Sequence, residues 1–250
     1  MSAKTSERQG KISAALVIFA KAPIPGQVKT RLSPALTEDE AATLHGSFVL
    51  DTLERTKAAV GKFKLPVDRF LACAPSSTHV FFRIMEARHG VTLLDQQGDD
   101  LGTRMHHAFD SLFARGYQRV CLVGTDVPSL PLAHYRDAME SLTRHDVVIG
   151  PASDGGYYLI GLTKSRPDLF TNIPWSTGSV MALTQQKAVA AGLKTALLPT
   201  WNDVDTIDNL HALIDESAAD KKRPQQERVF SMRTAGTLEL LAKRLQTRQV

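Results

Sequence analysis

The feature that most constrains this chain is an alternation of short apolar runs with amphipathic stretches of helical period. Apolar runs lie at residues 16–20, 69–74, 91–94, 119–124, 146–150 and 195–198. Several lack polar alternation, which is typical of strands buried on both faces of a parallel sheet. The main amphipathic stretches lie at 37–60, 77–89, 102–115, 132–144 and 177–191. This alternation predicts an α/β fold with helices on both faces of a sheet.

One further apolar run, at residues 157–162, follows the run at 146–150 after only a few residues. That interval is too short for a helical crossover between parallel strands, so an antiparallel strand is expected there. Thr37 and Glu40 have the spacing of a capping box and predict the start of the first long helix. We therefore expect a mixed, mainly parallel sheet flanked by helices.

Composition excludes several classes of protein. With 250 residues, 43% of them hydrophobic and 22% charged, the chain can bury a large core, and it is neither a disordered nor a disulfide-built protein. Cys73 and Cys121 lie in apolar runs, where a reduced buried thiol is expected. No run approaches the roughly 18 apolar residues of a membrane span. We expect a cytoplasmic protein without a membrane span.

The positive charge is concentrated at the C-terminus. Residues 221–250 hold eight Lys or Arg against two acids, which leaves the first 220 residues slightly negative although the whole chain carries +4. A basic face for nucleic acid is therefore not expected on the main domain. We expect a polar arm at 1–13, one main domain at 14–220, and a basic linker with a C-terminal helix at 221–250.

The loop after the first apolar run is strongly basic. It contains Lys21, Lys29 and Arg31, and it is stiffened by prolines that include Pro25, next to Gly26. Ligands of open α/β sheets bind beyond the carboxyl ends of the strands, where this loop would lie. A polyphosphate suits it, because Lys supplies a point charge and Arg a bidentate fork. The alternative is a solvated basic turn.

Two other loops after apolar runs carry carboxylates. Thr125 and Asp126 follow one run, and Asp203 and Asp205 follow the last one. In an extended segment Asp203 and Asp205 would lie on the same side. Carboxylates at strand ends suit Mg²⁺ or Mn²⁺, which prefer oxygen ligands. The alternative is that these residues cap helices.

Two glycine-containing segments are weaker candidates. Asp154 precedes Gly155 and Gly156, which would allow a ligand to approach the backbone closely, although Asp-Gly is also a common turn. Gly102 and Arg104 lie in a polar segment that suits contacts to a base or ribose. Alternatively, Arg104 pairs with an acid on the surface.

Six blocks of sequence together resemble a known family. They are Phe-Ala-Lys-x-Pro-x-Pro-Gly-x-Val-Lys-Thr-Arg-Leu, Asp-Leu-Gly-x-Arg-Met, Gly-Thr-Asp-x-Pro-x-Leu, Gly-Pro-x-x-Asp-Gly-Gly-Tyr-Tyr-Leu-Ile-Gly-Leu, Trp-Ser-Thr and Asp-Val-Asp-Thr. In this order they resemble the bacterial glycosyltransferase-A-like family of the nucleotide-diphospho-sugar transferase superfamily, over about residues 14–215. Residues 29–33 are also similar to the start of the 2-phospho-L-lactate guanylyltransferases.

The resemblance implies a role for each matching residue. Catalytic roles would fall to Lys29, Arg31 and Asp154. The nucleotide would contact Lys21, Pro25, Gly26, Lys29, Arg31, Gly102, Arg104 and Thr125. The acceptor or sugar side would be lined by Asp154, Gly155, Gly156 and Trp175, and Mg²⁺ or Mn²⁺ would be held by Asp126, Asp205 and Asp203.

The resemblance implies a metal-dependent transferase that takes a nucleotide-activated substrate and a small-molecule acceptor, in the first place a glycosyltransferase that uses a nucleotide sugar. The alternative enzyme is a guanylyltransferase-like nucleotidyltransferase, which condenses a nucleoside triphosphate with a phosphorylated or carboxylated acceptor. An alternative of another class is a nucleotide-binding module without turnover. A single Asp126 replaces the Asp-x-Asp of glycosyltransferases, and the first loop is rich in proline where sugar nucleotidyltransferases have glycines. Both reaction types stay open at this point.

Overall fold

The computed structural model describes residues 13–247, and a mixed sheet forms its centre. The strands are β1 (Ala14–Lys21), β2 (Val67–Ala74), β3 (Thr92–Asp95), β4 (Arg119–Val123), β5 (Val147–Pro151), β6 (Tyr157–Leu162) and β7 (Thr195–Leu197). Their order in the sheet is β3-β2-β1-β4-β6-β5-β7. Only β6 runs antiparallel to its neighbours, β4 and β5. The expected mixed, mainly parallel sheet is thereby confirmed, including its antiparallel strand.

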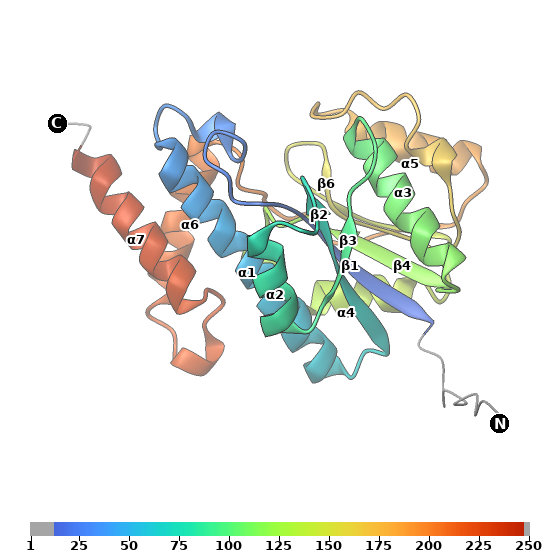
Figure 1. Cartoon of the computed structure of the whole chain (residues 1–250), viewed down its shortest axis with the longest axis horizontal. Helices are drawn as coiled ribbons and strands as arrows, with labels where there is room; N and C mark the ends of the chain where they lie inside the picture. Colours follow the sequence, from blue (N-terminus) through green and yellow to red (C-terminus); the bar gives the residue numbers. More distant parts are fainter. Residues whose placement is uncertain (1–12, 248–250) are drawn as a thin grey trace.

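Helices cover both faces of the sheet, with α1, α2 and α4 on one face and α3 and α5 on the other (Figure 1). They are α1 (Glu38–Phe63), α2 (Val80–His89), α3 (Leu101–Ala114), α4 (Leu132–Ser141), α5 (Val180–Ala190), α6 (Ile207–Asp220) and α7 (Met232–Thr247). Short 3₁₀ turns lie at Thr30–Leu32, Pro167–Leu169 and Gln225–Glu227. α1 begins at the predicted capping box, in which Thr37 and Glu40 exchange two hydrogen bonds.

The core explains why the strand sequences lack polar alternation. Along β1, Leu16 and Ile18 pack on the α1 side, and Val17 packs on the α3 side, where Phe109 contributes to the same cluster. All of these side chains are fully buried. Because both faces of the sheet are covered, successive residues of a central strand are equally apolar. Both cysteines are buried and unpaired within these layers.

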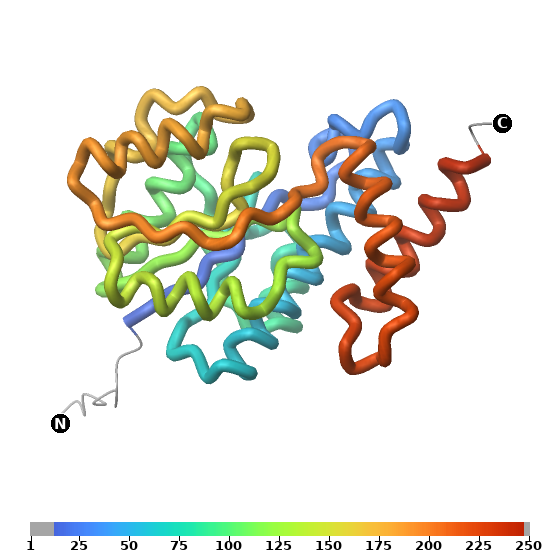
Figure 2. The backbone as a smooth tube through the Cα atoms, turned by 180° about the vertical axis from the view of Figure 1, so that it is seen from behind, coloured from blue at the N-terminus to red at the C-terminus, as the bar shows by residue number. Residues whose placement is uncertain are grey.

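The C-terminal segment packs on the main body. In Figures 1 and 2, α6 and α7 lie side by side at the end of the molecule away from α3 and α5. A third core cluster joins α6 and α7 to the first half of α1, with Phe48, Leu213 and Leu241 among its buried members. α7 (Met232–Thr247) is the helix of this C-terminal segment. None of the described helices is long and apolar enough to cross a bilayer.

The polar arm expected at 1–13 lies outside the described residues except for Ser13, whose carbonyl accepts hydrogen bonds from the backbone N–H groups of Gln118 and Arg119. β1 and β4 run parallel, so their carboxyl ends lie side by side at the end of the strands that is opposite to Ser13. β6 runs the other way, so the loop before it also lies at this edge. The fold therefore brings three loops that are far apart in the sequence to the same end of the strands.

Candidate functional site

A cleft of about 590 Å³ lies at the carboxyl edge of the sheet. Most of the residues singled out in the sequence line it, together with several that were not. Its polar and aromatic lining includes Lys21, Lys29, Arg31, His45, Gln96, Asp99, Asp100, Arg104, Thr125, Asp126, Asp154, Gly156, Trp175, Asp203 and Asp205.

Lys29 is at the centre of this lining. Its backbone adopts a left-handed conformation with φ of 50°, immediately before the 3₁₀ turn at Thr30. Its ammonium contacts the carboxylates of Asp126 and Asp205, and it donates a 2.8 Å hydrogen bond to the carbonyl of Val204. The side chain is only 3% exposed. The ammonium is therefore fully engaged by protein oxygens.

Burial alone would lower the pKa of Lys29, but the charges of Asp126 and Asp205 outweigh it and raise that pKa above its ordinary value. Burial likewise opposes ionisation of Asp126, and Lys29 reverses the effect, so the pKa of Asp126 is lowered. The backbone N–H of Val204 also donates to the carbonyl of Asp126 at 3.0 Å. Two carboxylates that the sequence suggested as a metal pair are thus bridged by an ammonium.

A second group of carboxylates consists of Asp154, Asp203 and Asp205, whose nearest ligand atoms all lie within 4.8 Å of one another. Asp203 is buried, and burial together with the charges of Asp154 and Asp205 raises its pKa to about 6. Asp154 accepts a 2.8 Å hydrogen bond from the backbone N–H of Gly156. Three hard oxygen donors that repel one another suit a divalent cation such as Mg²⁺ or Mn²⁺. Asp154, expected on the acceptor side, belongs to this carboxylate group.

Three other basic side chains of the cleft are less constrained than Lys29. Arg31 is half-exposed, and its contacts to Asp205 (3.6 Å) and to the carbonyl of Ser176 (3.5 Å) are long. Lys21 is exposed and makes no ion pair within residues 13–247. Arg104 donates from Nε to a backbone carbonyl at 2.8 Å, and its two terminal nitrogens bond to no described residue. These cations can accept an anionic ligand at little cost in existing contacts.

Two glycines hold the walls of the cleft close together without lining it themselves. Gly155 has φ of 88°, and a Cβ there would lie 2.2 Å from the carbonyl oxygen of Gly178. A Cβ at Gly102 would lie 2.4 Å from the ring of Trp175. Trp175 therefore packs directly on the first turn of α3. Each position needs glycine because a neighbouring loop occupies the space of a side chain.

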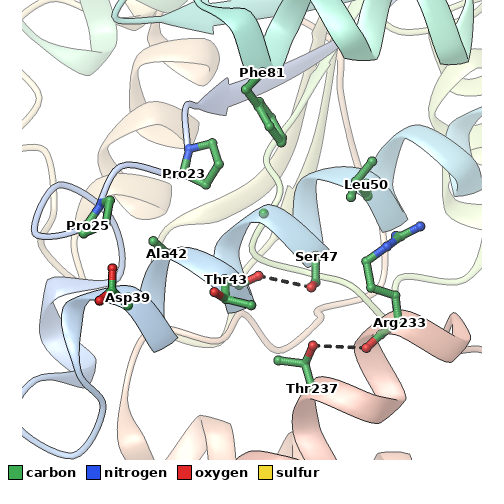
Figure 3. A pocket seen from close by; sticks show the side chains of 11 residues that line it. Pro23, Pro25, Asp39, Ala42, Thr43, Ser47, Leu50, Phe81, Arg233 and Thr237 are labelled. Carbon is green, nitrogen blue, oxygen red and sulfur yellow. Dashed lines mark hydrogen bonds between the residues drawn. The ribbon is translucent and has the colours of Figure 1, made fainter.

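Pro25 faces away from the cleft. It lines a second cavity of about 470 Å³ between α1, α2 and α7, shown in Figure 3. This second cavity is lined by Pro23, Pro25, Asp39, Ala42, Thr43, Gly46, Ser47, Leu50, Phe81, Arg233 and Thr237. Gly26, with φ of 75°, has the carboxylate of Glu38 at 3.2 Å from the position of a Cβ, and it does not line the cleft either. The basic loop thus has two sides, and only one of them faces the cleft.

Sequence reasoning missed His45 and Gln96. His45 projects from α1, its Nε2 lies 3.0 Å from the carbonyl of Lys21, and burial lowers its pKa. A histidine in the middle of a helix gives no sequence signal for such a role. Gln96 follows β3 directly, so the rule that selected the loops after the other strands would also have found it.

Comparisons with known proteins agree with this fold. A family model described as "uncharacterized protein conserved in bacteria (DUF2064)" matches residues 58–177. A crystal structure from Desulfovibrio desulfuricans G20, of a protein provisionally described as a nucleotide-diphospho-sugar transferase, is 34% identical, covers 94% of this chain and 97% of its own, and superposes with a TM-score of 0.79. A cytidylyltransferase from Leptospira borgpetersenii, 15% identical with a TM-score of 0.52 over 93% of this chain and 94% of its own, shares the fold alone.

Among curated proteins, the 2-phospho-L-lactate guanylyltransferase of Methanothermobacter thermautotrophicus is 29% identical over 144 residues. The match covers 56% of this chain and 59% of that enzyme, so the chain spans about three fifths of its curated relative.

The sheet order and the cleft at its carboxyl edge define the class as the nucleotide-diphospho-sugar transferase fold. Similarity to the Desulfovibrio protein over nearly the whole of both chains shows the family. The chain belongs to the same family as the Desulfovibrio protein, within the nucleotide-diphospho-sugar transferase superfamily.

Proposed function

We propose that this protein is a metal-dependent nucleotidyltransferase that joins a nucleoside triphosphate to an acceptor carrying a phosphate or a carboxylate. The observation that carries the proposal is the charge arrangement of the cleft. Asp154, Asp203 and Asp205 gather at one place, while Lys21 and Arg31 line the same cleft with few contacts of their own. Clustered carboxylates beside loosely held cations suit a nucleoside triphosphate bound with a divalent metal.

The three clustered carboxylates would hold the metal. When bound, Mg²⁺ or Mn²⁺ supplies positive charge to the phosphate oxygens, an effect commonly worth several kcal/mol in the transition state. It would also offset the burial and the repulsion from Asp154 and Asp205 that together raise the pKa of Asp203. The donor set therefore fits a divalent cation by its chemistry, its crowding and its charge.

The basic residues would have different tasks. Arg31 and Lys21 would bind the phosphates, because neither gives up a short ion pair to do so. Lys29 acts as a positioning residue, since its ammonium holds Asp126 and Asp205 at fixed places. Asp126 in turn holds Lys29. In this proposal Asp126 anchors the ammonium, and the metal-ligand role that the resemblance implies for Asp126 stays untested.

In the proposed reaction an acceptor oxygen attacks the α-phosphorus of the triphosphate. A new P–O bond forms, the bond between the α-phosphorus and the bridging oxygen breaks, and pyrophosphate leaves with the electron pair. The acceptor is already an anion, so the protein needs neither a nucleophile nor a base. The residues of the chain orient the triphosphate and neutralise the charge that develops on the leaving group.

The curated guanylyltransferase relative supports nucleotidyl transfer. Glycosyl transfer from a nucleotide sugar is a second candidate, supported by the nearly full-length similarity to the Desulfovibrio protein and its provisional description. An acceptor hydroxyl would then need a base, and the exposed carboxylate of Asp154 would be available for that task.

Phosphorus NMR of the protein with Mg²⁺, acceptor mixtures, and either nucleoside triphosphates or nucleotide sugars separates these alternatives. Nucleotidyl transfer releases pyrophosphate, whereas glycosyl transfer releases a nucleoside diphosphate. Calorimetric titration of the same nucleotides provides the binding control. Binding without either product for any acceptor would contradict a transferase and support a nucleotide-binding module.

A further inference from the structure

We propose that Tyr158, fixed by His134, is a positioning residue that holds the loop carrying Asp203 and Asp205 in place for metal binding. This inference rests on the proposed metal-dependent function, and it adds two residues to it that are not themselves metal ligands. It comes from the way in which the hydroxyl and the backbone of Tyr158 join two loops that follow different strands.

A bulge in the sheet directs the Tyr158 side chain. Between Gly150 and Pro151 of β5 the pairing with β6 shifts by one residue, and Tyr158 is the residue in excess. Bulges are common next to functional sites, where they change the direction of a side chain. The Tyr158 ring lies directly over Gly150, where a Cβ would be only 2.3 Å from the ring. Glycine is therefore needed at this position of β5 so that the ring can cross the strand.

The hydroxyl of Tyr158 reaches the loop after β7. In the sheet β5 lies between β6 and β7. The ring crosses β5, and its hydroxyl donates a 3.0 Å hydrogen bond to the carbonyl of Pro199. Pro199 lies four residues before Asp203 and six before Asp205. The bond therefore fixes the start of the segment that ends in the two carboxylates.

The backbone of Tyr158 reaches the loop after β4. Its carbonyl accepts a 2.9 Å hydrogen bond from the N–H of Gly124, two residues before Asp126. The two loops also contact each other directly, since the N–H of Val204 donates to the carbonyl of Asp126. Tyr158 is thus bonded to both loops, and a displacement of its side chain would move one of them relative to the other.

His134 of α4 fixes the direction of the Tyr158 hydroxyl. Its Nδ1 lies 2.9 Å from the hydroxyl oxygen. The single proton of that hydroxyl is used on Pro199, so the oxygen accepts and Nδ1 carries a proton. Both side chains are buried. Because buried polar chains with every group paired are rigid, the hydroxyl has one arrangement.

Trp201 supplies a second connection between this loop and its surroundings. Its backbone N–H donates to the carbonyl of Pro151 at 3.0 Å, and its indole N–H donates to the hydroxyl of Ser129 at 3.2 Å. Its ring meets the His134 ring edge to face, with centroids 5.4 Å apart. Between β7 and α6 the chain forms no helix or strand beyond one bridge at Trp201, so side-chain hydrogen bonds replace a ladder there.

The first test compares Tyr158→Phe with the unaltered protein after a chelator has removed bound metal. The variant keeps the ring over Gly150 and loses only the hydroxyl. Mn²⁺ binding is measured by electron paramagnetic resonance, and we expect the affinity to fall about tenfold, the low end of the range for residues that orient metal ligands. Unchanged affinity in the folded variant would overturn the inference. Absence of Mn²⁺ binding by the unaltered protein would instead contradict the proposed function itself.

The matched control is Tyr117→Phe. The Tyr117 hydroxyl donates a 2.6 Å hydrogen bond to Asp68 near the amino ends of β2 and β4, so the same atom is lost far from the cleft. Both variants should have a lower Tm, because each loses a hydrogen bond, but only Tyr158→Phe should bind Mn²⁺ more weakly. A merely structural role for Tyr158 would lower Tm and leave its Mn²⁺ affinity equal to that of the control.

Amide hydrogen exchange provides a readout that needs no metal. In Tyr158→Phe the amides of Trp201 and Val204 should exchange about tenfold faster than in the unaltered protein, because the loop opens more readily. Should Tyr158→Phe fail to fold, His134→Leu takes its place. It leaves the tyrosine hydroxyl without its donor, and Mn²⁺ affinity should fall about threefold, as for one hydrogen bond. Unchanged exchange and unchanged affinity in the folded variant would overturn the inference.

Discussion

The cleft at the carboxyl edge and the second cavity between α1, α2 and α7 are similar in size, about 590 and 470 Å³, but they treat polar groups differently. In the second cavity the hydroxyl of Ser47 donates to the carbonyl of Thr43, and that of Thr237 donates to Arg233 (Figure 3). Arg233 itself pairs with Glu54 at 3.4 Å. Both hydroxyls are satisfied by carbonyls of their own helices, and Arg233 is held by an ion pair to α1.

The cleft is the opposite case. Asp154, Asp203 and Asp205 crowd together, and the free oxygen of Gln96 and the terminal nitrogens of Arg104 have no partner among the described residues. The volume of a cavity alone therefore does not identify a ligand-binding site. Groups held in place but left unpaired indicate a ligand, because the fold gains nothing from them by itself.

The same change, Asp to Asn, made once in each cavity tests whether the cleft and the second cavity differ in function. Asp205→Asn removes a charge from the carboxylate cluster and from the Lys29 contact, and we expect transferase turnover to fall about 10²- to 10³-fold, as when a group that stabilises a transition-state charge is lost. The matched control is Asp39→Asn, an exposed carboxylate of the second cavity. Turnover should be unchanged in that variant.

Metal-dependent nucleotide binding provides the readout if the acceptor is not yet known. Calorimetry with Mn²⁺ should show the loss for Asp205→Asn only. Equal losses in both variants would mean that the two cavities do not differ in function.

The second effect concerns stability. Leu241 of α7 is 4% exposed in the cluster shared with α1 and α6, whereas Leu240 beside it is 70% exposed. Leu241→Ala should lower the free energy of unfolding by about 2–5 kcal/mol, and Leu240→Ala should change it by less than about 0.5 kcal/mol. Urea denaturation measures both. Nucleotide affinity should be unaffected in each, because α7 does not line the cleft.

A third, smaller effect tests the wall of the cleft. Gly102→Ala adds a Cβ where the ring of Trp175 lies, so the ring must move, and we expect nucleotide affinity to fall about tenfold. The control is Gly61→Ala in α1, where nothing lies within 4 Å of the new Cβ. That change should leave affinity unchanged and stabilise the helix by up to about 1 kcal/mol. A shift of tryptophan fluorescence in Gly102→Ala alone would show the displacement of the ring.

Some parts of this structure were accessible from the sequence, and others depended on contacts that no local pattern encodes. The periodicity predicted the strands, the helices and the loops at the carboxyl edge, since burial on two faces leaves a direct trace in composition. The bridge from Lys29 to Asp126 and Asp205 joins residues up to 176 positions apart and depends on a left-handed backbone at a lysine. Likewise, the direction of the Gln96 amide follows from carbonyls on two other strands.

The smallest predicted effect concerns Asp51, a carboxylate buried between α1 and α7 near the second cavity. Its side chain is 3% exposed, the hydroxyls of Ser231 and Thr234 lie beside it, and the guanidinium of Arg233 is 3.9 Å away. Burial raises the pKa of Asp51 above its ordinary value, and Glu54 adds to the effect, while Ser231, Thr234 and Arg233 lower that pKa less than burial raises it.

The sign of the pH dependence follows from this direction. An acid whose pKa is higher in the folded state than in the unfolded state binds more protons when folded, so stability falls as the pH rises from about 4 through the raised pKa, and the cost persists above it. Asp51→Asn removes the charge and should raise Tm at pH 8 by about 2–4 °C, the shift expected for about 1 kcal/mol in a domain of this size. Calorimetric melts of both proteins between pH 4 and pH 8 should show the difference shrinking toward the acid end. A constant difference across this range would mean that the pKa of Asp51 is the same in the folded and unfolded states, and that burial of this carboxylate between α1 and α7 carries no pH-dependent cost.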